Sequence, residues 1–91
     1  MILMHLVSYD VRGLDWSRRG RIHRLLFGAV SRKRSGGVWK EYEYAGLLDR
    51  PNARWIGQSV VLLRPGDAEE LVRALRAIEV PHSLLRVSVG V

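Results

Sequence analysis

Hydrophobic residues occupy both faces of the alternating pattern along residues 1–9. Val7 and Tyr9 fall on one side of the extended chain, and Met4 and Leu6 fall on the other. A strand that is apolar on both faces is typical of the interior of a sheet, because neighbours cover it on each side. We therefore expect residues 1–9 to form a central strand.

A helix is predicted after the break in this pattern at residues 10–13. Its apolar positions recur at i, i+3, i+4 and i+7, and they are Ile22, Leu25, Leu26 and Ala29. This spacing gives one apolar stripe that packs on the sheet and leaves the basic residues on the surface. Asp15 or Ser17 can accept the first free amides, so we expect the helix to begin near Ser17. Cations at residues 32–34, near the negative end of the helix dipole, and the glycines at 36–37 predict its end.

Two more strands are predicted in the middle of the chain. Residues 38–45 alternate as a half-buried strand does, with aromatic side chains mostly on one side. Residues 55–63 are apolar enough for a second strand, and the polar segment 46–54 joins the two. We expect these strands to pair with each other through this long hairpin loop.

The C-terminal part of the sequence predicts a second helix and a last strand. Asp67 and Glu70 have the spacing of a capping box, and Pro81 prevents the helix from continuing. Residues 84–91 alternate between apolar and polar positions, which indicates a strand that runs to the end of the sequence.

The predicted order of elements is βαββαβ, in a single domain that spans residues 1–91. With right-handed connections, this order gives an α+β fold of the ferredoxin-like type, a four-stranded antiparallel sheet with two helices on one face. The second face of the sheet is then left apolar. Large apolar patches are unusual on monomers, so we expect a homodimer in which a second subunit covers this face.

Composition excludes several classes of protein. The chain is 47% hydrophobic and 26% charged, a balance typical of globular proteins and too apolar for a disordered one. Its apolar runs are far shorter than the ~20 residues of a bilayer helix, so we expect no membrane association. The N-terminal pattern is that of a strand and lacks the features of a signal peptide. The sequence contains no cysteine, which fits a reducing compartment, and we expect a cytoplasmic protein.

The formal net charge of +6 is concentrated in residues 12–34. Asp15 is the one acid of this segment, against eight cations: Arg12, Arg18, Arg19, Arg21, Arg24, Arg32, Lys33 and Arg34. A local cationic surplus of this kind attracts polyanions. These eight residues are therefore our candidate contacts for the phosphates of DNA or RNA.

Two short motifs resemble a known family. A hydrophobic strand ending in Tyr9-Asp10, then Arg18-Arg19, then a helix beginning Ile22-x-x-Leu25-Leu26, is similar to the opening of the CRISPR-associated Cas-two family. Members of that family are the small subunits that partner the spacer-acquisition integrase. Downstream, residues 58–60 (Gln-Ser-Val) resemble the family's Gln-x-Ser-Val-Phe strand, without its spacer residue. Val61 stands where the family prefers Phe, and residues 35–55 add a strand and a loop.

The resemblance implies a nucleic-acid-binding subunit of CRISPR adaptation, which contributes to antiviral defence. It also implies a homodimer in which the Asp10 carboxylates of two subunits meet and hold a divalent ion. Mg²⁺ suits such a pair because it prefers carboxylate and water oxygens. The chain would then be an endoribonuclease or endodeoxyribonuclease, with Asp10 as both metal ligand and catalytic residue and Arg18 or Arg19 on the phosphate. Many members hold DNA as scaffolds instead of cleaving it.

The residues by themselves leave other interpretations open. Asp10 equally fits an Asx-turn acceptor that leads into Arg12 and Gly13. The alternative for the whole chain is a ferredoxin-like regulatory or ligand-binding dimer, in which the sheet face and residues 46–54 form a pocket and the basic helix only keeps the protein in solution. His5, His23 and His82 lack the spacing of zinc ligands. We expect the tryptophans and tyrosines to lie in the core or the dimer interface.

Overall fold

The computed structural model describes residues 1–90. Along the chain the elements are β1 (Ile2–Tyr9), α1 (Trp16–Phe27), β2 (Ala29–Ser35), β3 (Val38–Tyr44), a 3₁₀ helix η1 (Leu47–Asp49), β4 (Arg54–Gly57), β5 (Val60–Leu63), α2 (Pro65–Ala77) and β6 (His82–Val89). They form one four-stranded sheet, in the order β4-β5-β1-β6, and one two-stranded sheet of β2 and β3. The predicted α+β class is confirmed. The predicted βαββαβ order is not matched as such, because the described residues contain six strands in two sheets.

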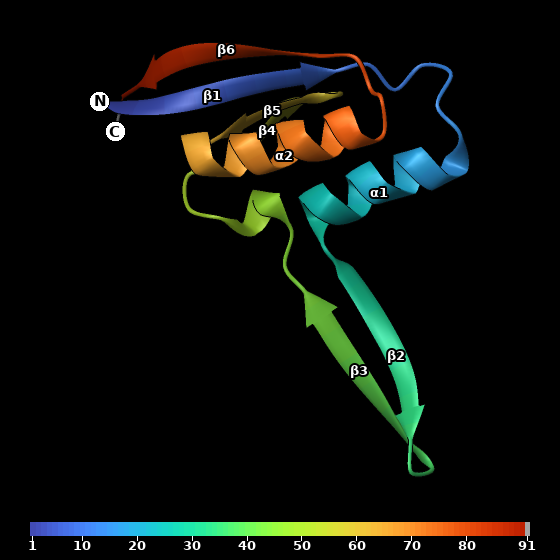
Figure 1. Cartoon of the computed structure of the whole chain (residues 1–91). Helices are drawn as coiled ribbons and strands as arrows, with labels where there is room; N and C mark the ends of the chain where they lie inside the picture. The colour runs from blue at the N-terminus through green and yellow to red at the C-terminus, as the bar shows by residue number, and fades with distance from the viewer. Residues whose placement is uncertain (91) are drawn as a thin grey trace.

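The four-stranded sheet is antiparallel throughout, and both helices lie against the same face of it (Figure 1). β1 is an inner strand between β5 and β6, which confirms the prediction for residues 1–9. Leu6 is paired with Leu62 on β5 and with Leu85 on β6. The apolar side chains of β1 therefore have apolar neighbours on both adjacent strands.

The core lies between this sheet and the helices. Its fully buried side chains come from β1, β5, both helices and η1, and they include Val7, Val61, Leu63, Leu26, Leu71, Leu75 and Leu47. Each such side chain contributes about 1.5–3 kcal/mol when it leaves water. η1 matters for the path of the chain, because Leu47 is only 2% exposed and anchors the segment that returns from β3 to the sheet.

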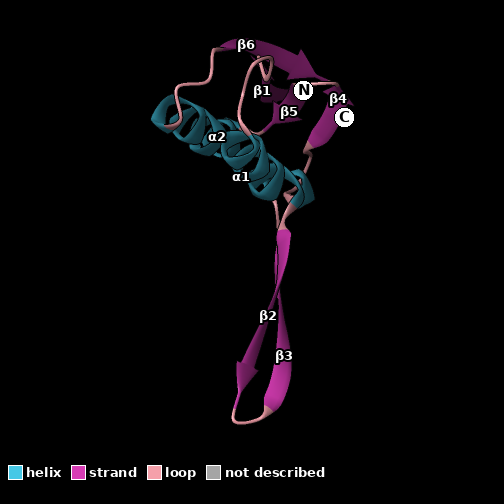
Figure 2. Cartoon of the chain, turned by 90° about the vertical axis from the view of Figure 1, so that its right-hand side faces the viewer, coloured by secondary structure: helices cyan, strands magenta, loops and turns pink. Residues whose placement is uncertain are grey.

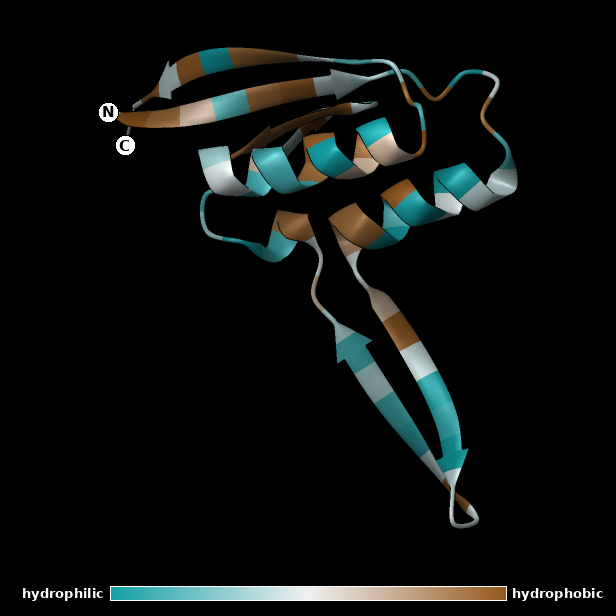
Figure 3. Ribbon diagram, viewed as in Figure 1, coloured by the Kyte–Doolittle hydropathy of each residue, from teal (hydrophilic) through white to brown (hydrophobic). Residues whose placement is uncertain are grey.

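The opposite face of the sheet is apolar and has no helix over it. Leu62 must point to this face, since its neighbours Val61 and Leu63 point into the core. The pairing of strands then places further apolar side chains beside it: Ile2, Met4, Leu6, Val60, Leu85, Val87 and Val89. Met4 and Leu62 are buried, Leu85 is 62% exposed and the others are half-buried, and Figure 3 shows hydrophobic positions recurring along β1 and β6. We call this surface the outer face.

β2 and β3 form a long hairpin that projects from the body of the molecule (Figure 2). We call residues 29–44 the ribbon. The seven residues of β2 pair with the seven of β3, from Ala29 with Tyr44 to Ser35 with Val38. The turn is Gly36-Gly37, with φ of 58° and 81°. A two-residue turn with both φ values positive matches the twist of a hairpin, which explains why glycine occupies both positions.

Several predicted boundaries are wrong. The first helix ends at Phe27, and residues 29–35, expected at its C-terminal end, form a strand instead. Gly28 has φ 85° and breaks the helix, so the chain leaves as extended backbone. Residues 38–44 consequently pair with β2 and not with residues 55–63. The predicted strand 55–63 is two strands, β4 and β5, separated by Gln58 and Ser59.

The C-terminal predictions are corrected in detail. α2 begins at Pro65, so Asp67 lies inside its first turn and does not cap it as predicted. The last strand begins at His82, earlier than expected, and residue 91, included in the predicted strand, lies outside the described residues.

Candidate nucleic-acid interface

A cleft of about 730 Å³ lies where β1 ends. Its polar lining comes from four parts of the chain: the end of β1 with the loop after it, α1, the turn between β4 and β5, and the start of β6. It includes Ser8, Tyr9, Asp10, Arg12, Arg19, Gln58, Ser59, His82 and Ser83. The amide of Tyr9 donates to the carbonyl of Ser59 at 3.0 Å, and the amide of Asp10 donates to that of Pro81 at 2.9 Å. The two sequence motifs that resemble the Cas-two family, around Asp10 and around Ser59, therefore meet in this cleft.

Asp10 is held by Arg12 at the mouth of the cleft. Its Oδ1 accepts from the Arg12 amide at 2.9 Å and from Nε at 3.0 Å, and its Oδ2 accepts from Nη2 at 2.8 Å. The Arg12 side-chain hydrogen bonds, joined by the backbone one, lower the pKa of the Asp10 carboxyl from 3.8 to about 2. Asp10 is thus an Asx-turn acceptor in this chain, with an ion pair added to the turn.

The residues around Asp10 do not by themselves fit a Mg²⁺ site. Both of its oxygens are occupied by Arg12, and among residues 1–90 no three His, Asp or Glu side chains gather as metal ligands would. Mg²⁺ prefers one or two carboxylates with water or phosphate. The site implied by the family resemblance needs the Asp10 of a second subunit and the release of Arg12.

Several other polar side chains of the cleft have hydrogen-bond partners within the protein. The hydroxyls of Ser8 and Ser83 are 3.1 Å apart, and the His82 ring shares a hydrogen bond with the Val80 carbonyl at 2.9 Å. Burial raises the pKa of the Tyr9 phenol, which keeps that group protonated. Arg19 donates through Nε to the carbonyl of Leu14 and through Nη2 to that of Val11. Arg19 therefore braces the loop between β1 and α1.

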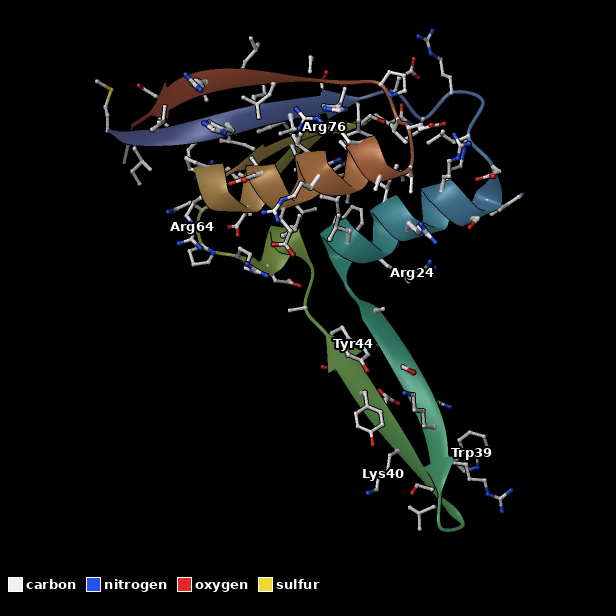
Figure 4. All side chains as sticks on the ribbon, viewed as in Figure 1. Arg24, Trp39, Lys40, Tyr44, Arg64 and Arg76 are labelled. Carbon is white, nitrogen blue, oxygen red and sulfur yellow. The ribbon has the colours of Figure 1, made fainter. Side chains whose placement is uncertain are left out.

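The predicted cations of α1 have different surroundings. Asp15 caps the helix, and its Oδ1 accepts from the Arg18 amide at 2.9 Å. The side chain of Arg18 is half-buried and borders a shallow depression with Asp15 and Glu79. Arg21 and Arg24 are exposed, and their guanidinium groups make no hydrogen bond or ion pair in the part of the chain that the structure describes. Arg24 lies on the side of α1 from which the ribbon projects (Figure 4).

The remaining predicted cations lie on the ribbon and not on the helix. Arg32 pairs with Glu41 across the strands at 3.3 Å. Lys33 and Arg34 are exposed, and they form no ion pair within residues 1–90. The eight predicted contacts are therefore divided among three places: the cleft loop, the surface of α1 and the ribbon.

The ribbon also contains exposed residues that sequence reasoning did not select. Trp39 is 66% exposed, Tyr42 is 42% exposed and Tyr44 is 54% exposed. These aromatics therefore lie outside the core, and of the two predicted locations only the dimer interface is left. Lys40 adds a cation on β3. The sequence signal was the pair of glycines at 36–37 between two polar segments, which is typical of a tight hairpin.

A small aromatic group borders the cleft on the α1 side. The rings of His23 and Phe27 are 4.7 Å apart, and Phe27 meets Trp55 edge-on at 6.4 Å. Phe27 and Trp55 are 48% and 61% exposed. They contribute a partly open apolar wall next to the polar lining of the cleft.

Comparisons of the chain with protein-family models, with curated proteins and with solved structures find no match. The resemblance to the Cas-two family therefore rests on the residues quoted above. Neither helix is long and apolar enough to cross a lipid bilayer, within the residues described.

Proposed function

We propose that this chain is a nucleic-acid-binding protein of the cytoplasm, and that its ribbon and the outer surface of α1 contact phosphates. The observation that carries the proposal is the charge of residues 32–40. This segment holds Arg32, Lys33, Arg34 and Lys40 and no acid, and every one of its residues is exposed. Arg32 is paired with Glu41, whereas Lys33, Arg34 and Lys40 form no ion pair within residues 1–90. Cations concentrated on an open, projecting element are placed to meet a polyanion.

The surface of α1 extends this charge toward the body. Arg21 and Arg24 are exposed, and neither is neutralised by an acid among the described residues. Arg24 is near the point where the chain enters β2, so helix and ribbon offer cations on one side of the molecule (Figure 4). By contrast, the cations Arg50 and Arg64 are engaged by Asp67. Arg54, Arg76 and Arg86 are also exposed and form no ion pair within residues 1–90, but each lies on a different element. The unpaired positive charge is therefore most concentrated on α1 and the ribbon.

The experiment is a titration of fluorescent duplex DNA, duplex RNA and single strands at two salt concentrations. Binding should weaken steeply as salt rises, because each neutralised phosphate releases counterions. Arg21→Gln with Arg24→Gln should reduce affinity about 10-fold or more. Arg73→Gln with Arg76→Gln on α2 removes the same charge elsewhere and should cost less than about 3-fold. Absence of binding to every probe at low salt overturns the proposal and leaves the regulatory or ligand-binding dimer as the alternative.

We also propose that the four-stranded sheet and its helices are a ferredoxin-like domain into which the ribbon is inserted. Without β2 and β3 the order of elements is βαββαβ, and β1 lies in the middle of the sheet as that fold requires. The outer face supports a homodimer, because a second copy offers the same apolar surface and an isologous contact covers both at once.

The role in CRISPR adaptation, with an integrase subunit as partner and Mg²⁺-dependent cleavage at Asp10, is supported by the sequence resemblance alone. Binding is proposed independently of cleavage, since Arg12 occupies both oxygens of Asp10. Co-purification of the chain with an integrase encoded beside it would test the partner.

A further inference from the structure

The ribbon does not take part in the four-stranded sheet of the body. Its strands pair only with each other, and residues 32–45 are all exposed. An isolated two-stranded hairpin is marginally stable in water, because it buries little apolar surface. Figure 3 shows hydrophilic colours along most of β3. The charged side chains of the ribbon, and its exposed Val30, Val38 and Trp39, are therefore open to a partner.

The two faces of the ribbon differ in charge. Residues directly opposite each other in the pairing share a face, and successive residues alternate. One face holds Ala29, Ser31, Lys33, Ser35, Val38, Lys40, Tyr42 and Tyr44, and we call it the lysine face. The other holds Val30, Arg32, Arg34, Trp39, Glu41 and Glu43. Figure 4 shows Lys40 and Trp39 pointing to opposite sides of β3. Both acids of the ribbon are therefore on the face away from Lys40.

Lys33 and Lys40 form a directly opposed pair on the lysine face. Like charges at opposed positions destabilise a hairpin, because their Cβ atoms lie only about 4.5–5.5 Å apart. The neighbours on this face are serine, valine and tyrosine, so within the described residues no acid relieves the repulsion. On the other face the corresponding contact, Arg32 with Glu41, is an ion pair. An anion bound between the two lysines would remove the repulsion.

We infer that the ribbon enters the major groove of duplex DNA with its lysine face toward the nucleic acid. This inference rests on the proposed function and specifies both the element that makes the contact and the form of the ligand. Lys33 and Lys40 would bind backbone phosphates, and the hydroxyls of Tyr42 and Tyr44 would donate to phosphate or base-edge oxygens. Glu41 and Glu43, on the opposite face, point away from the phosphates.

Dimensions favour duplex DNA over the other forms of nucleic acid. The major groove of B-form DNA is about 12 Å wide and admits a two-stranded ribbon. The major groove of A-form RNA is deep and too narrow for side chains to read. Single strands are generally bound on a platform where bases stack in succession. The lysine face has its two aromatic residues near the base of the ribbon and cations near the tip, which suits a groove better than a stacking platform.

The test compares two neighbouring substitutions with equal change of charge. Lys33→Glu lies on the lysine face, and Arg34→Glu lies beside it on the opposite face. We expect Lys33→Glu to weaken binding to duplex DNA at least 10-fold and to lower the slope of log K against log salt by about 1. Arg34→Glu should cost about 3-fold or less. Wild-type protein should bind duplex DNA more tightly than duplex RNA of the same sequence.

A second measurement distinguishes loss of the DNA contact at Lys33 from loss of the folded structure of the ribbon. Lys33→Glu places a carboxylate opposite Lys40, so hydrogen exchange of the ribbon amides should slow by about 2- to 5-fold in the free protein. A more stable ribbon with weaker DNA binding is the expected combination. Faster exchange in this variant would contradict the proposed like-charge contact.

The outcomes distinguish this inference from the proposed function. Equal losses for Lys33→Glu and Arg34→Glu, or tighter binding to duplex RNA or single strands, overturn the insertion of the lysine face in a DNA groove. If neither substitution matters while Arg21→Gln with Arg24→Gln abolishes binding, the ribbon is not the contact, and it becomes a candidate surface for a protein partner. If wild-type protein binds no nucleic acid, both proposals fall.

Discussion

Gly28 and Gly46 face each other where the two strands of the ribbon leave the body. A Cβ atom on Gly28 would collide with the carbonyl oxygen of Tyr44, and one on Gly46 would collide with the carbonyl oxygen of Leu26. Gly46 is buried, and the amide of Gly46 donates to the carboxylate of Asp49 at 2.8 Å. We call the close contact of Gly28 and Gly46 the neck. It leaves no space for a side chain at either position.

Substitution at this neck should therefore destabilise the whole protein. We expect Gly28→Ala and Gly46→Ala each to lower the free energy of unfolding by at least about 1–3 kcal/mol, through collision with backbone and, at Gly28, a positive φ as well. Urea denaturation followed by circular dichroism measures the change. Gly66→Ala, in the first turn of α2 with open space around it, is the control and should be neutral or slightly stabilising. Equal stability of all three variants would show that the neck relaxes freely.

The contact between Asp10 and Arg12 predicts a dependence on pH. The pKa of Asp10 is lowered in the folded chain to about 2, so its contribution to stability is complete above pH 3.8 and is lost as the pH falls toward 2. Carboxyl carbon NMR shifts should show Asp10 titrating near pH 2. In Arg12→Gln the Asp10 pKa should return most of the way to 3.8, apart from the effect of the backbone hydrogen bond. An unchanged titration in that variant would mean that the ion pair does not form in solution.

Asp67 joins two parts of the chain that are distant in sequence. Its side chain is 8% exposed, and it accepts from Arg50 at 2.9 Å and from Arg64 at 3.4 Å. Asp67→Ala should destabilise the protein by about 1–3 kcal/mol, because charged hydrogen bonds are lost. Thermal or urea unfolding measures this. Glu69→Ala, which removes an exposed carboxylate 3.7 Å from Arg73, should change stability by less than about 0.5 kcal/mol.

The outer face predicts the oligomeric state. Leu85→Glu places a charge on the apolar surface and should convert a dimer to a monomer in sedimentation or light-scattering measurements. Ser88→Glu adds the same charge to the other face of β6, at an exposed position, and should leave the dimer intact. A wild-type protein that is monomeric at all concentrations would contradict the homodimer.

The resemblance to the Cas-two family predicts Mg²⁺-dependent cleavage of nucleic acid. In the structure Arg12 would compete with Mg²⁺ for the oxygens of Asp10. Asp10→Ala should abolish cleavage while the circular dichroism spectrum stays unchanged. Arg12→Ala frees both oxygens of Asp10 and should increase cleavage at limiting Mg²⁺. Cleavage that persists at the same rate in Asp10→Ala would indicate a contaminating nuclease.

The pattern of apolar and polar residues was sufficient to predict elements that lie against the core. β1 was predicted correctly because apolar residues on both faces, such as Met4 and Val7, are specific to an inner strand. The start of α1 was within one residue of the prediction, since Asp15 is a strong capping residue. The ribbon was missed because β2 is polar and unburied, so no apolar period marks it. Ala29 continued the helical spacing, whereas Gly28 ended the helix.

The sequence predicted which types of residue could form the candidate site. It did not predict which partners each side chain has in the fold. Charge alone pointed to Arg12 and Arg19, but in the structure both side chains bind groups of the loop after β1. Which cations stay free depends on partners brought together by the fold, as Glu41 is for Arg32. The opposed position of Lys33 and Lys40 likewise follows from the pairing of two strands, which required the turn at Gly36-Gly37 to be recognised.

The insertion of the ribbon between α1 and η1 has a consequence for engineering. Because its strands share no pairing with the four-stranded sheet, the arm can be lengthened or shortened without disturbing the rest of the molecule. Side chains alternate with a period of two, so adding two residues to each strand keeps Lys33 and Lys40 in phase, whereas adding one turns them away. The length of the ribbon can therefore be changed in steps of about 6.6 Å, the rise of two residues in a strand.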